Sequence, residues 1–303
     1  MELGMIGLGK MGGFMVERLV RGGHRIIGLD RDPAAVARVV EKGATGAEST
    51  EKLIGQLKTP RAIWIMVPSG KPVDDTIDQL LPHLSPGDAI IDGGNSYYRD
   101  SVRRGAALAP KKINFVDCGT SGGVWGLTEG YSMMVGGDAE VVKRLAPIFQ
   151  TLAPGPEKGW GRVGPTGAGH YVKMVHNGIE YAIMQAYAEG LDLFRHKTEF
   201  GLDLLQITKI WQYGSVVRSW LLDLTVDALS KNPTLDGIEA FVTDSGEGRW
   251  TAMEGIEHGV PLPALTGALD ARFRSQDPQP FANKLLAMMR HEFGGHAVKT
   301  ATK

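Results

Sequence analysis

The sequence predicts an α/β fold in which a doubly wound, mostly parallel sheet is followed by an all-helical domain. Short apolar runs alternate with helical patterns through the first half of the chain, as is typical of β-α-β units. A glycine-rich turn joins the first apolar run to the first helical pattern. No strand pattern occurs after about residue 164. We therefore expect an N-terminal domain at residues 1–163 and an all-helical C-terminal domain at residues 164–303.

In the N-terminal domain, apolar runs bounded by glycine, proline or acidic residues predict the strands. The expected strands cover residues 2–6, 25–29, 62–67, 89–92, 114–117 and 132–135. Apolar residues at helical spacing predict helices at residues 11–22, 33–42 and 73–81. Because a helix follows each of the first three strands, we expect mostly parallel pairing with right-handed crossovers.

The second half of the chain changes to helical patterns. The longest covers residues 167–195, about eight turns at 3.6 residues per turn. Further helices are expected at residues 203–211, 216–231, 248–258, 263–274 and 281–293. A glycine turn at residues 161–164 marks the expected domain boundary.

Composition and charge restrict the class of protein. Hydrophobic residues make up 43% of the chain and charged residues 22%, which is the composition of a globular protein. Lys plus Arg number 33 and Asp plus Glu 34, and this balance argues against nucleic-acid binding through a general positive field. The longest apolar run is far shorter than the ~20 residues of a membrane helix. The single cysteine, Cys118, makes neither an intramolecular disulfide nor a cysteine-rich zinc site. We expect a cytoplasmic protein with no nucleic-acid or membrane partner and no metal.

The glycine-rich turn predicts a dinucleotide site of the Rossmann type. It has the spacing G-x-G-x-x-G and consists of Gly7, Leu8, Gly9, Lys10, Met11 and Gly12. The first glycine permits the turn, the second lets a pyrophosphate approach, and the third lets helix and strand pack closely. Asp30 follows the second expected strand and is placed to accept a hydrogen bond from the adenosine ribose. Its charge favours NAD over NADP, although Arg31 could pair with a 2′-phosphate. The alternative is a plain strand-to-helix turn beside a solvated arginine.

Four polar residues of the long helix predict the catalytic face. Lys173, His176, Asn177 and Glu180 follow the spacing i, i+3, i+4 and i+7, which places them on one side of a helix. A buried lysine can act as a general base and a glutamate can deliver a proton. We expect both groups to face the cleft where the nicotinamide ring ends. The alternative is a polar helix face exposed to water.

Two glycine turns and the C-terminal segment add candidate binding groups. Asn95 follows Gly93 and Gly94 at the end of an expected strand, and a second turn contains Ser121, Gly122 and Gly123. Both turns can offer polar groups to a sugar acid. Near the C-terminus, Arg290, Phe293 and His296 form a candidate anion-binding cluster. In isolation, a plain glycine turn is favoured for the first two segments and a basic helix end for the third.

Taken together, these segments resemble the 6-phosphogluconate dehydrogenase family. The resemblance rests on residues 7–12, IDGGNSY at 91–97, residues 121–123, KMVHNGIEY at 173–181 and RHEFGGH at 290–296, and it spans nearly the whole chain. It implies an NAD(P)-dependent oxidoreductase of the pentose phosphate pathway. The implied reaction is oxidative decarboxylation of 6-phospho-D-gluconate to D-ribulose 5-phosphate and CO₂. The shortened C-terminal half resembles the short bacterial form, whose members often use NAD.

The resemblance also implies a role for each matching residue. Lys173 would take the proton of the substrate 3-hydroxyl and later protonate the 3-keto group, and Glu180 would protonate C1. The groups implied to hold the sugar acid are Asn95, Ser121, Gly122, Gly123, His176 and Asn177. Those implied to make the substrate-phosphate and C-terminal-tail contacts are Tyr181, Arg272, Arg290 and His296. The last two come from a neighbouring subunit, which implies a homodimer or larger homo-oligomer. Those implied to contact the cofactor are the six residues 7–12, Asp30, Arg31, Val67, Pro68 and Asn95.

The sequence departs from the family pattern at two places. Asp30-Arg31-Asp32 stands where the family usually has an Asn-Arg-Thr-like triplet, which supports NAD. Residues 244–250 are shorter than their counterpart and lack its phosphate-binding lysine, for which Arg249 is a candidate substitute. Two alternatives remain: a 3-hydroxyisobutyrate-type β-hydroxyacid dehydrogenase without decarboxylation, and a catalytically silent dinucleotide-binding regulator.

Overall fold

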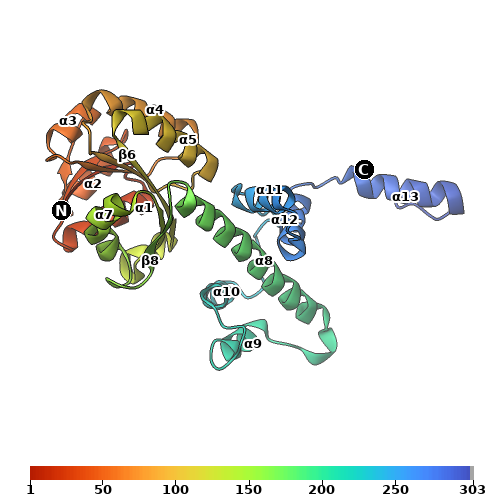
Figure 1. The fold of residues 1–303 in the computed structure, drawn as a ribbon. Helices are drawn as coiled ribbons and strands as arrows, with labels where there is room; N and C mark the ends of the chain where they lie inside the picture. The colour runs from red at the N-terminus through yellow and green to blue at the C-terminus, as the bar shows by residue number, and fades with distance from the viewer. Residues whose placement is uncertain (301–303) are drawn as a thin grey trace. The chain divides into compact units, whose positions relative to one another are not determined.

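The computed structural model describes residues 1–300 of the chain (Figure 1). These residues form two compact units, the first at Met1–His176 and the second beginning at Asn177. The boundary lies within the long helix α8, Ala168–His196.

The first unit is built on one eight-stranded sheet with the order β3-β2-β1-β4-β5-β6-β7-β8. Strands β1 to β6 pair in parallel, β7 runs antiparallel to β6, and β8 pairs in parallel with β7. The strands are β1 Glu2–Ile6, β2 Arg25–Leu29, β3 Thr45–Gly46, β4 Ala62–Ile65, β5 Ala89–Asp92, β6 Asn114–Ser121, β7 Ser132–Gly136 and β8 Trp160–Gly164. The order reverses between β1 and β4, so the predicted doubly wound, mostly parallel sheet is confirmed. In such sheets ligands bind at the carboxyl ends of the strands, beside this reversal.

Helices cover both faces of the sheet, because successive side chains of each strand point to opposite faces. Leu3 and Met5 of β1 belong to an apolar core with residues of α1 and α7, whereas Ile6 belongs to a second core with residues of α3, α4 and α5. The helices of this unit are α1 Lys10–Arg21, α2 Pro33–Val40, α3 Thr50–Gly55, α4 Lys71–Leu80, α5 Tyr98–Leu108, α6 Gly126–Glu129 and α7 Ala139–Leu152.

Several elements of the first unit were not expected from the sequence. They are strands β3 and β8 and helices α3, α5, α6 and α7. Residues 161–164, interpreted as a glycine turn, belong to the edge strand β8. The glycines hide any alternating pattern, and the strand is held by its pairing with β7 and by Trp160, whose ring stacks on Phe149 with centroids 5.4 Å apart. These contacts join residues far apart in the sequence, so no local pattern predicts them.

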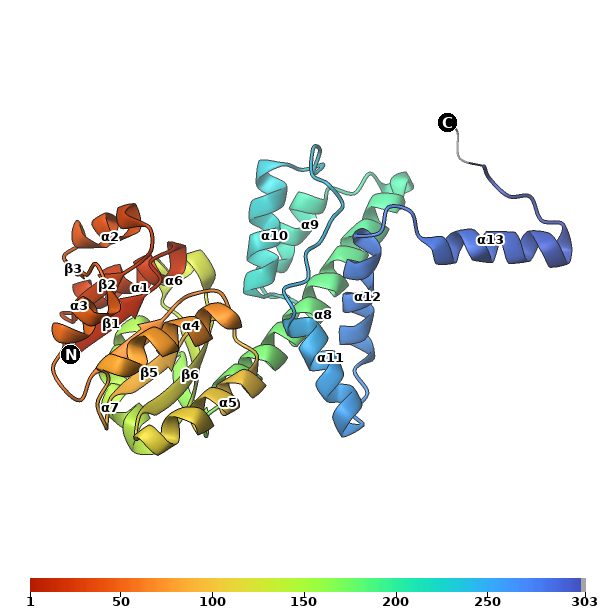
Figure 2. The same cartoon turned by 90° about the horizontal axis from the view of Figure 1, so that it is seen from above.

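In the second unit the described residues 177–300 form helices and no strands, which agrees with the sequence (Figure 2). After α8 come α9 Leu204–Trp211, α10 Trp220–Lys231, α11 Glu247–His258, α12 Pro263–Ser275 and α13 Phe281–Gly294. Helix α10 begins at Trp220, later than predicted, because the Ser219 hydroxyl accepts a hydrogen bond from the Leu222 N–H at 3.1 Å and caps the helix there. None of the helices within residues 1–300 is both long and apolar enough to cross a lipid bilayer.

Candidate active site

The glycine-rich turn between β1 and α1 leaves room for a ligand at one position only. A Cβ on Gly7, whose φ is +92°, would lie 2.4 Å from the Met66 carbonyl oxygen, and a Cβ on Gly12 would lie 2.0 Å from the Gly7 oxygen. Apart from its neighbours in the chain, no residue places an atom within 4 Å of the Cβ position of Gly9. The turn is therefore closed at its first and third glycines and open at the second, as a pyrophosphate at a helix N-terminus requires.

Asp30 lies directly beside this turn. Its carboxylate accepts hydrogen bonds from the Leu8 N–H at 2.6 Å and the Asp32 N–H at 2.9 Å. The backbone of the glycine-rich turn thus fixes the acid that the sequence assigns to the ribose. Arg31 is exposed, and its guanidinium is free to extend toward solvent.

The ends of β4 and β5 meet the same turn. Val67 follows β4. A Cβ on Gly7 would lie 3.3 Å from the Val67 side chain, and a Cβ on Gly94 would lie 3.1 Å from the Val67 carbonyl oxygen. Pro68 is exposed. The buried carboxylate of Asp92 accepts hydrogen bonds from the Gly94 N–H and the Ser96 hydroxyl, at 3.2 and 2.7 Å.

This arrangement leaves Asn95 exposed between two anchored neighbours. Three segments predicted to contact the cofactor are thereby brought together at one edge of the sheet.

Strand β6 brings the third glycine turn close to the proposed base. It ends at Ser121, and Gly122 and Gly123 follow with φ of +126° and +51°, a backbone region that favours glycine. Two residues before Ser121, a Cβ on Gly119 would lie only 2.3 Å from the Cβ of Lys173. Helix α8 therefore lies directly on β6. The base of the Lys173 side chain contacts the strand that ends at Ser121.

The polar face of α8 is not the solvated face weighed as the alternative. Lys173 is 7% exposed and Asn177 9% exposed, while His176 and Glu180 are half-buried. The helix is continuous from Ala168 to His196, so Lys173 and Glu180 are about 10 Å apart along its axis at 1.5 Å per residue.

A polar cluster in the second unit surrounds Tyr181. The Tyr181 hydroxyl lies 3.0 Å from the Ser245 hydroxyl and accepts a hydrogen bond from the Ser245 N–H at 3.2 Å. The Arg272 guanidinium carbon lies 3.4 Å from the centroid of the Tyr181 ring, and its Nη1 donates to the Thr243 carbonyl oxygen at 2.8 Å. The structure therefore gathers two residues implied to bind phosphate, Tyr181 and Arg272, with the divergent segment at residues 244–250.

Arg249 is already paired within this cluster. Its Nη2 donates to the Asp244 carboxylate at 2.6 Å. Burial by itself raises the pKa of Asp244, but hydrogen bonds from the Gly246 N–H and from Arg249 outweigh it and hold that pKa below its usual value. An anion that recruits Arg249 has to compete with this carboxylate.

Arg290 and His296 are not joined to the Tyr181 cluster of the same chain. Both are exposed, and α13, which carries Arg290, has no buried residue. In both views α13 extends away from α11 and α12 of the same unit (Figures 1 and 2). The predicted phosphate-binding set is therefore divided within one chain.

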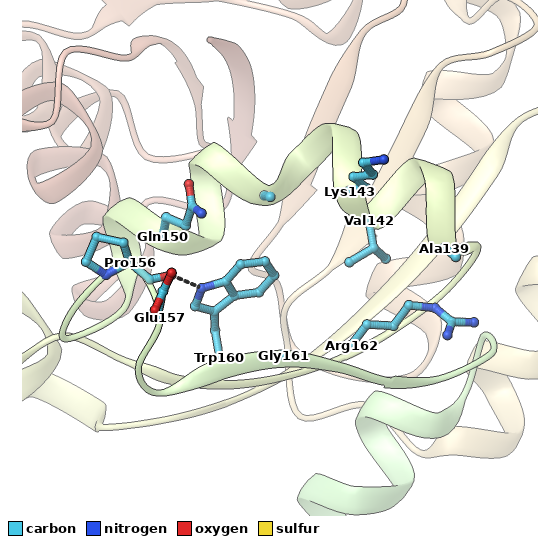
Figure 3. A pocket seen from close by; sticks show the side chains of 10 residues that line it. Ala139, Val142, Lys143, Gln150, Pro156, Glu157, Trp160, Gly161 and Arg162 are labelled. Carbon is cyan, nitrogen blue, oxygen red and sulfur yellow. Dashed lines mark hydrogen bonds between the residues drawn. The ribbon is translucent and has the colours of Figure 1, made fainter.

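A pocket of about 410 Å³ lies elsewhere on the first unit, between α7 and β8 (Figure 3). Trp160 forms part of its wall, held by a hydrogen bond from its indole N–H to the Pro156 carbonyl oxygen at 2.8 Å. None of the predicted site residues lines this pocket. It is a surface hollow separate from the strand ends described above.

Two buried residues near the site were not singled out from the sequence, Asp117 and Gly119. Asp117 stands at the end of an apolar run and Gly119 lies within the same strand. A charged residue next to a buried strand was the available signal, but its partners are residues 167 and 170, which only the tertiary structure brings close.

Two protein-family models match the sequence of this chain. Residues 2–163 match the model described as the NAD binding domain of 6-phosphogluconate dehydrogenase. Residues 169–301 match the model described as the C-terminal domain of 6-phosphogluconate dehydrogenase. Together the two models cover almost the whole chain.

Individual relatives agree with the models. The chain is 42% identical over 299 residues to the NAD(+)-dependent, decarboxylating 6-phosphogluconate dehydrogenase of Haloferax volcanii, covering 98% of each protein. It is 37% identical over 302 residues to the decarboxylating enzyme of Bacillus licheniformis, covering 94% of this chain but 64% of that one.

Two solved structures are also similar. The 6-phosphogluconate dehydrogenase of Plasmodium falciparum has a TM-score of 0.84 and 30% identity, over 99% of this chain and 66% of that chain. The 3-hydroxyisobutyrate dehydrogenase of Mycobacterium tuberculosis has a TM-score of 0.73 and 21% identity, over 91% of this chain and 94% of that chain, which shows a shared fold.

Proposed function

Because the chain belongs to the 6-phosphogluconate dehydrogenase family, we propose how its own residues carry out the oxidative decarboxylation of 6-phospho-D-gluconate. The protein is an NAD-dependent oxidoreductase of the decarboxylating type, and its products are D-ribulose 5-phosphate and CO₂. The observation that carries the residue assignment is the buried Lys173, seated on Gly119 of the strand that ends at Ser121.

The residues at the β1 end fit the cofactor. The open position at Gly9 admits the pyrophosphate to the N-terminus of α1, where backbone N–H groups lack helical partners. Asp30 would accept a hydrogen bond from the ribose 2′-hydroxyl and repel a 2′-phosphate, which favours NAD over NADP. When bound, NAD accepts the hydride that leaves C3 of the sugar acid.

Lys173 serves as the base in the first step. As the C3–H bond breaks, the 3-hydroxyl proton passes to the Lys173 amine, which leaves a ketone beside the C2 carbon. This step needs Lys173 as the neutral amine. The 3-keto acid is a β-keto acid, and it loses CO₂ most readily when its ketone is protonated. The same Lys173, now charged, is the donor for that proton.

Glu180 completes the reaction. Loss of CO₂ leaves an enediol, which becomes ribulose 5-phosphate when C1 receives a proton. Glu180 lies two helical turns after Lys173 on the same helix. By its match to the family motif, it is proposed to protonate the carbon next to the one whose oxygen Lys173 serves.

The remaining polar residues are proposed to hold the sugar acid. Ser121, Gly122 and Gly123 are proposed to offer a hydroxyl and backbone N–H groups, and Asn95 an amide from the neighbouring strand end. His176 and Asn177 lie on the same face of α8 as Lys173. Tyr181 and Arg272 are proposed to bind the phosphate, and Arg249 contributes only where the anion displaces Asp244.

We also propose that two copies of the chain complete each other's sites. Helix α13 has no buried residue although its exposed side chains include large apolar ones, and such a surface is normally covered by a partner. The exposed apolar side chains of α13 are Phe281, Leu285, Leu286, Met288, Met289 and Phe293. In a dimer this helix would bring Arg290 and His296 to the Tyr181 cluster of its neighbour.

A cytoplasmic location is proposed because NAD and phosphorylated sugar acids, both charged, are retained inside cells.

The assay of this function compares two substrates. NADH absorbance and CO₂ release are followed with 6-phosphogluconate and, separately, with 3-hydroxyisobutyrate. We expect equal amounts of NADH and CO₂ with the first and little signal with the second. NADH without CO₂, and only with 3-hydroxyisobutyrate, would favour the alternative β-hydroxyacid dehydrogenase.

A further inference from the structure

The carboxylate of Asp117 joins strand β6 to the start of helix α8. Asp117 is 0% exposed, and its two oxygens accept hydrogen bonds from the N–H of Gly167 at 2.6 Å and the N–H of His170 at 2.8 Å. The first N–H groups of a helix have no partner within the helix, so a strand residue supplies the cap here. The negative charge also lies at the positive end of the helix dipole.

Glycines allow α8 to lie directly on the sheet at this point. A Cβ on Gly136 of β7 would lie 2.7 Å from the Gly169 N, and one on Gly169 would lie 2.5 Å from the Met134 and Asp117 carbonyl oxygens. One turn further along, the Cβ position of Gly119 is 2.3 Å from the Cβ of Lys173. The glycines thus leave the helix backbone in direct contact with the strands, so a small movement of the helix start directly moves Lys173.

We propose that Asp117 is a positioning residue for the reaction. It acts through Lys173, which follows the capped residue His170 by three positions, and through β6, which ends in the Ser121–Gly123 turn. Its two hydrogen bonds set the height and rotation of α8 above β6, and with them the distance from the Lys173 amine to the substrate hydroxyl. This inference rests on the proposed function, because it assumes that Lys173 is the base.

Replacing Asp117 with Asn separates this role from simple capping. The amide oxygen accepts one of the two hydrogen bonds, while the amide NH₂ faces the other N–H donor and cannot accept from it. The charge at the helix end is also lost. The start of α8 is expected to shift by a fraction of an ångström without unfolding the sheet.

The test uses Asp117→Asn with Asp138→Asn as its matched control. Asp138 also caps a helix, α7, but it is exposed and one of its oxygens accepts from the N–H groups of both Glu140 and Val141, so an Asn oxygen can keep both bonds. It is remote from the proposed chemistry in sequence and contacts. For Asp117→Asn we expect kcat to fall about 10–100-fold, because misplacement by about 1 Å costs on the order of 10²-fold. KM for 6-phosphogluconate and NAD should change less than about 3-fold, since substrate and cofactor contacts stay in place.

Two further measurements distinguish a misplaced Lys173 from a smaller amount of folded protein. With substrate deuterated at C3, the isotope effect on kcat should rise in Asp117→Asn, because a misplaced base slows the hydride step. Labelling of Lys173 by an amine reagent, mapped by mass spectrometry, should become faster, since Lys173 is nearly buried in the native chain. Asp138→Asn should change neither quantity.

The labelling readout needs no substrate, so it separates this inference from the proposed function. An inactive native protein would overturn the proposed function, whereas unchanged labelling and an unchanged isotope effect in a folded Asp117→Asn variant would overturn the positioning role. If that variant does not fold, Gly119→Ala tests the same contact from the strand side and should give the same changes. Failure of both to fold, with Asp138→Asn folded, would show a purely structural role and overturn the inference.

Discussion

At the scale of single residues, Lys173 and Asp30 show how contacts give a side chain its role. Lys173 is buried because Gly119 lets the helix approach the strand, and Asp30 is oriented because the Leu8 N–H donates to it. Neither contact involves residues adjacent in the sequence. Each residue can be changed with a clear expected consequence.

Lys173→Met should abolish turnover and leave NAD binding within about 2-fold of the native value. Methionine keeps most of the volume and suits a buried site, but it cannot accept the hydroxyl proton. The cofactor phosphates are proposed to bind at residues 7–12, apart from Lys173. Steady-state rates and NAD titration by fluorescence measure the two effects, with Lys143→Met of α7 as the control. An equal loss of rate and binding would mean that Lys173 contacts the cofactor.

Asp30→Ala should raise the use of NADP relative to NAD. Removing the carboxylate removes a hydrogen bond to the NAD ribose and the repulsion of the NADP 2′-phosphate. Arg31 is then the nearest cation to that phosphate. The ratio of kcat/KM for the two cofactors is the measurement, and Asp138→Ala, which removes an acid at the start of α7, is the control. An unchanged ratio would place Asp30 away from the ribose.

At the scale of elements, the glycine-rich turn and α1 act as one unit, and its glycines have separable tasks. Gly9→Ala should weaken NAD binding at least 10-fold with little change in melting temperature, because its Cβ would enter the open position meant for the pyrophosphate. Gly12→Ala should instead destabilise the fold by about 1–3 kcal/mol, because its Cβ would meet the Gly7 oxygen. Calorimetry of both variants, with and without NAD, distinguishes the effects. The reverse pattern would contradict the roles assigned to these glycines.

Helices α4 and α5 are joined by an ion pair that makes stability depend on pH. The Arg104 guanidinium, with help from Arg103 and against partial burial, holds the pKa of Asp74 below its usual value. A carboxylate with a lowered pKa in the folded state stabilises the fold above its unfolded pKa of about 3.9, and this contribution is lost as pH falls through the folded pKa. Asp74→Asn should therefore reduce stability at neutral pH and flatten the decline below about pH 4. Urea unfolding between pH 3 and 7 measures this, with the exposed Asp78→Asn as control; parallel curves for native protein and Asp74→Asn would disprove it.

At the scale of the whole molecule, the predicted site needs residues that one chain does not bring together. Arg290 and His296 are exposed, and α13, which carries Arg290, has no buried residue, as expected of a tail that serves a second copy. The domain boundary at residue 163 also remains a proposal. The compact unit extends to His176 and the first family model ends at residue 163, so the start of α8 packs with the sheet although the second model begins at residue 169.

Mixing two inactive variants tests the shared site. Lys173→Met lacks the base, and the double variant Arg290→Ala, His296→Ala lacks the tail groups. If tails are exchanged, a mixed dimer has one complete site, and equal random mixing restores about a quarter of native activity. Activity after co-refolding, together with the mass in solution, is the measurement. A monomeric native protein, or no recovery on mixing, would contradict exchange of the tail.

Local sequence patterns predicted six of the eight strands and three of the seven α-helices of the first unit, and each α-helix of the second. The alternation of apolar strands and helical patterns predicted β1, β2, β4, β5, β6 and β7, and the spacing of the glycines predicted the first turn. These features depend on residues close in the chain, whose preferences the sequence displays directly. The stripe at residues 173–180 was visible for the same reason.

Only the tertiary structure decided which polar residues are buried and what they contact. Strand β8 exists because Trp160 stacks on Phe149 and because β7 offers a free edge, and Arg249 is paired because Asp244 lies beside it. Lys173 and Asn177 lie in the interior and not in water, and Asp117 caps a helix fifty residues away. The free energy of each of these arrangements comes from burial and pairing between distant segments, which a local pattern does not record.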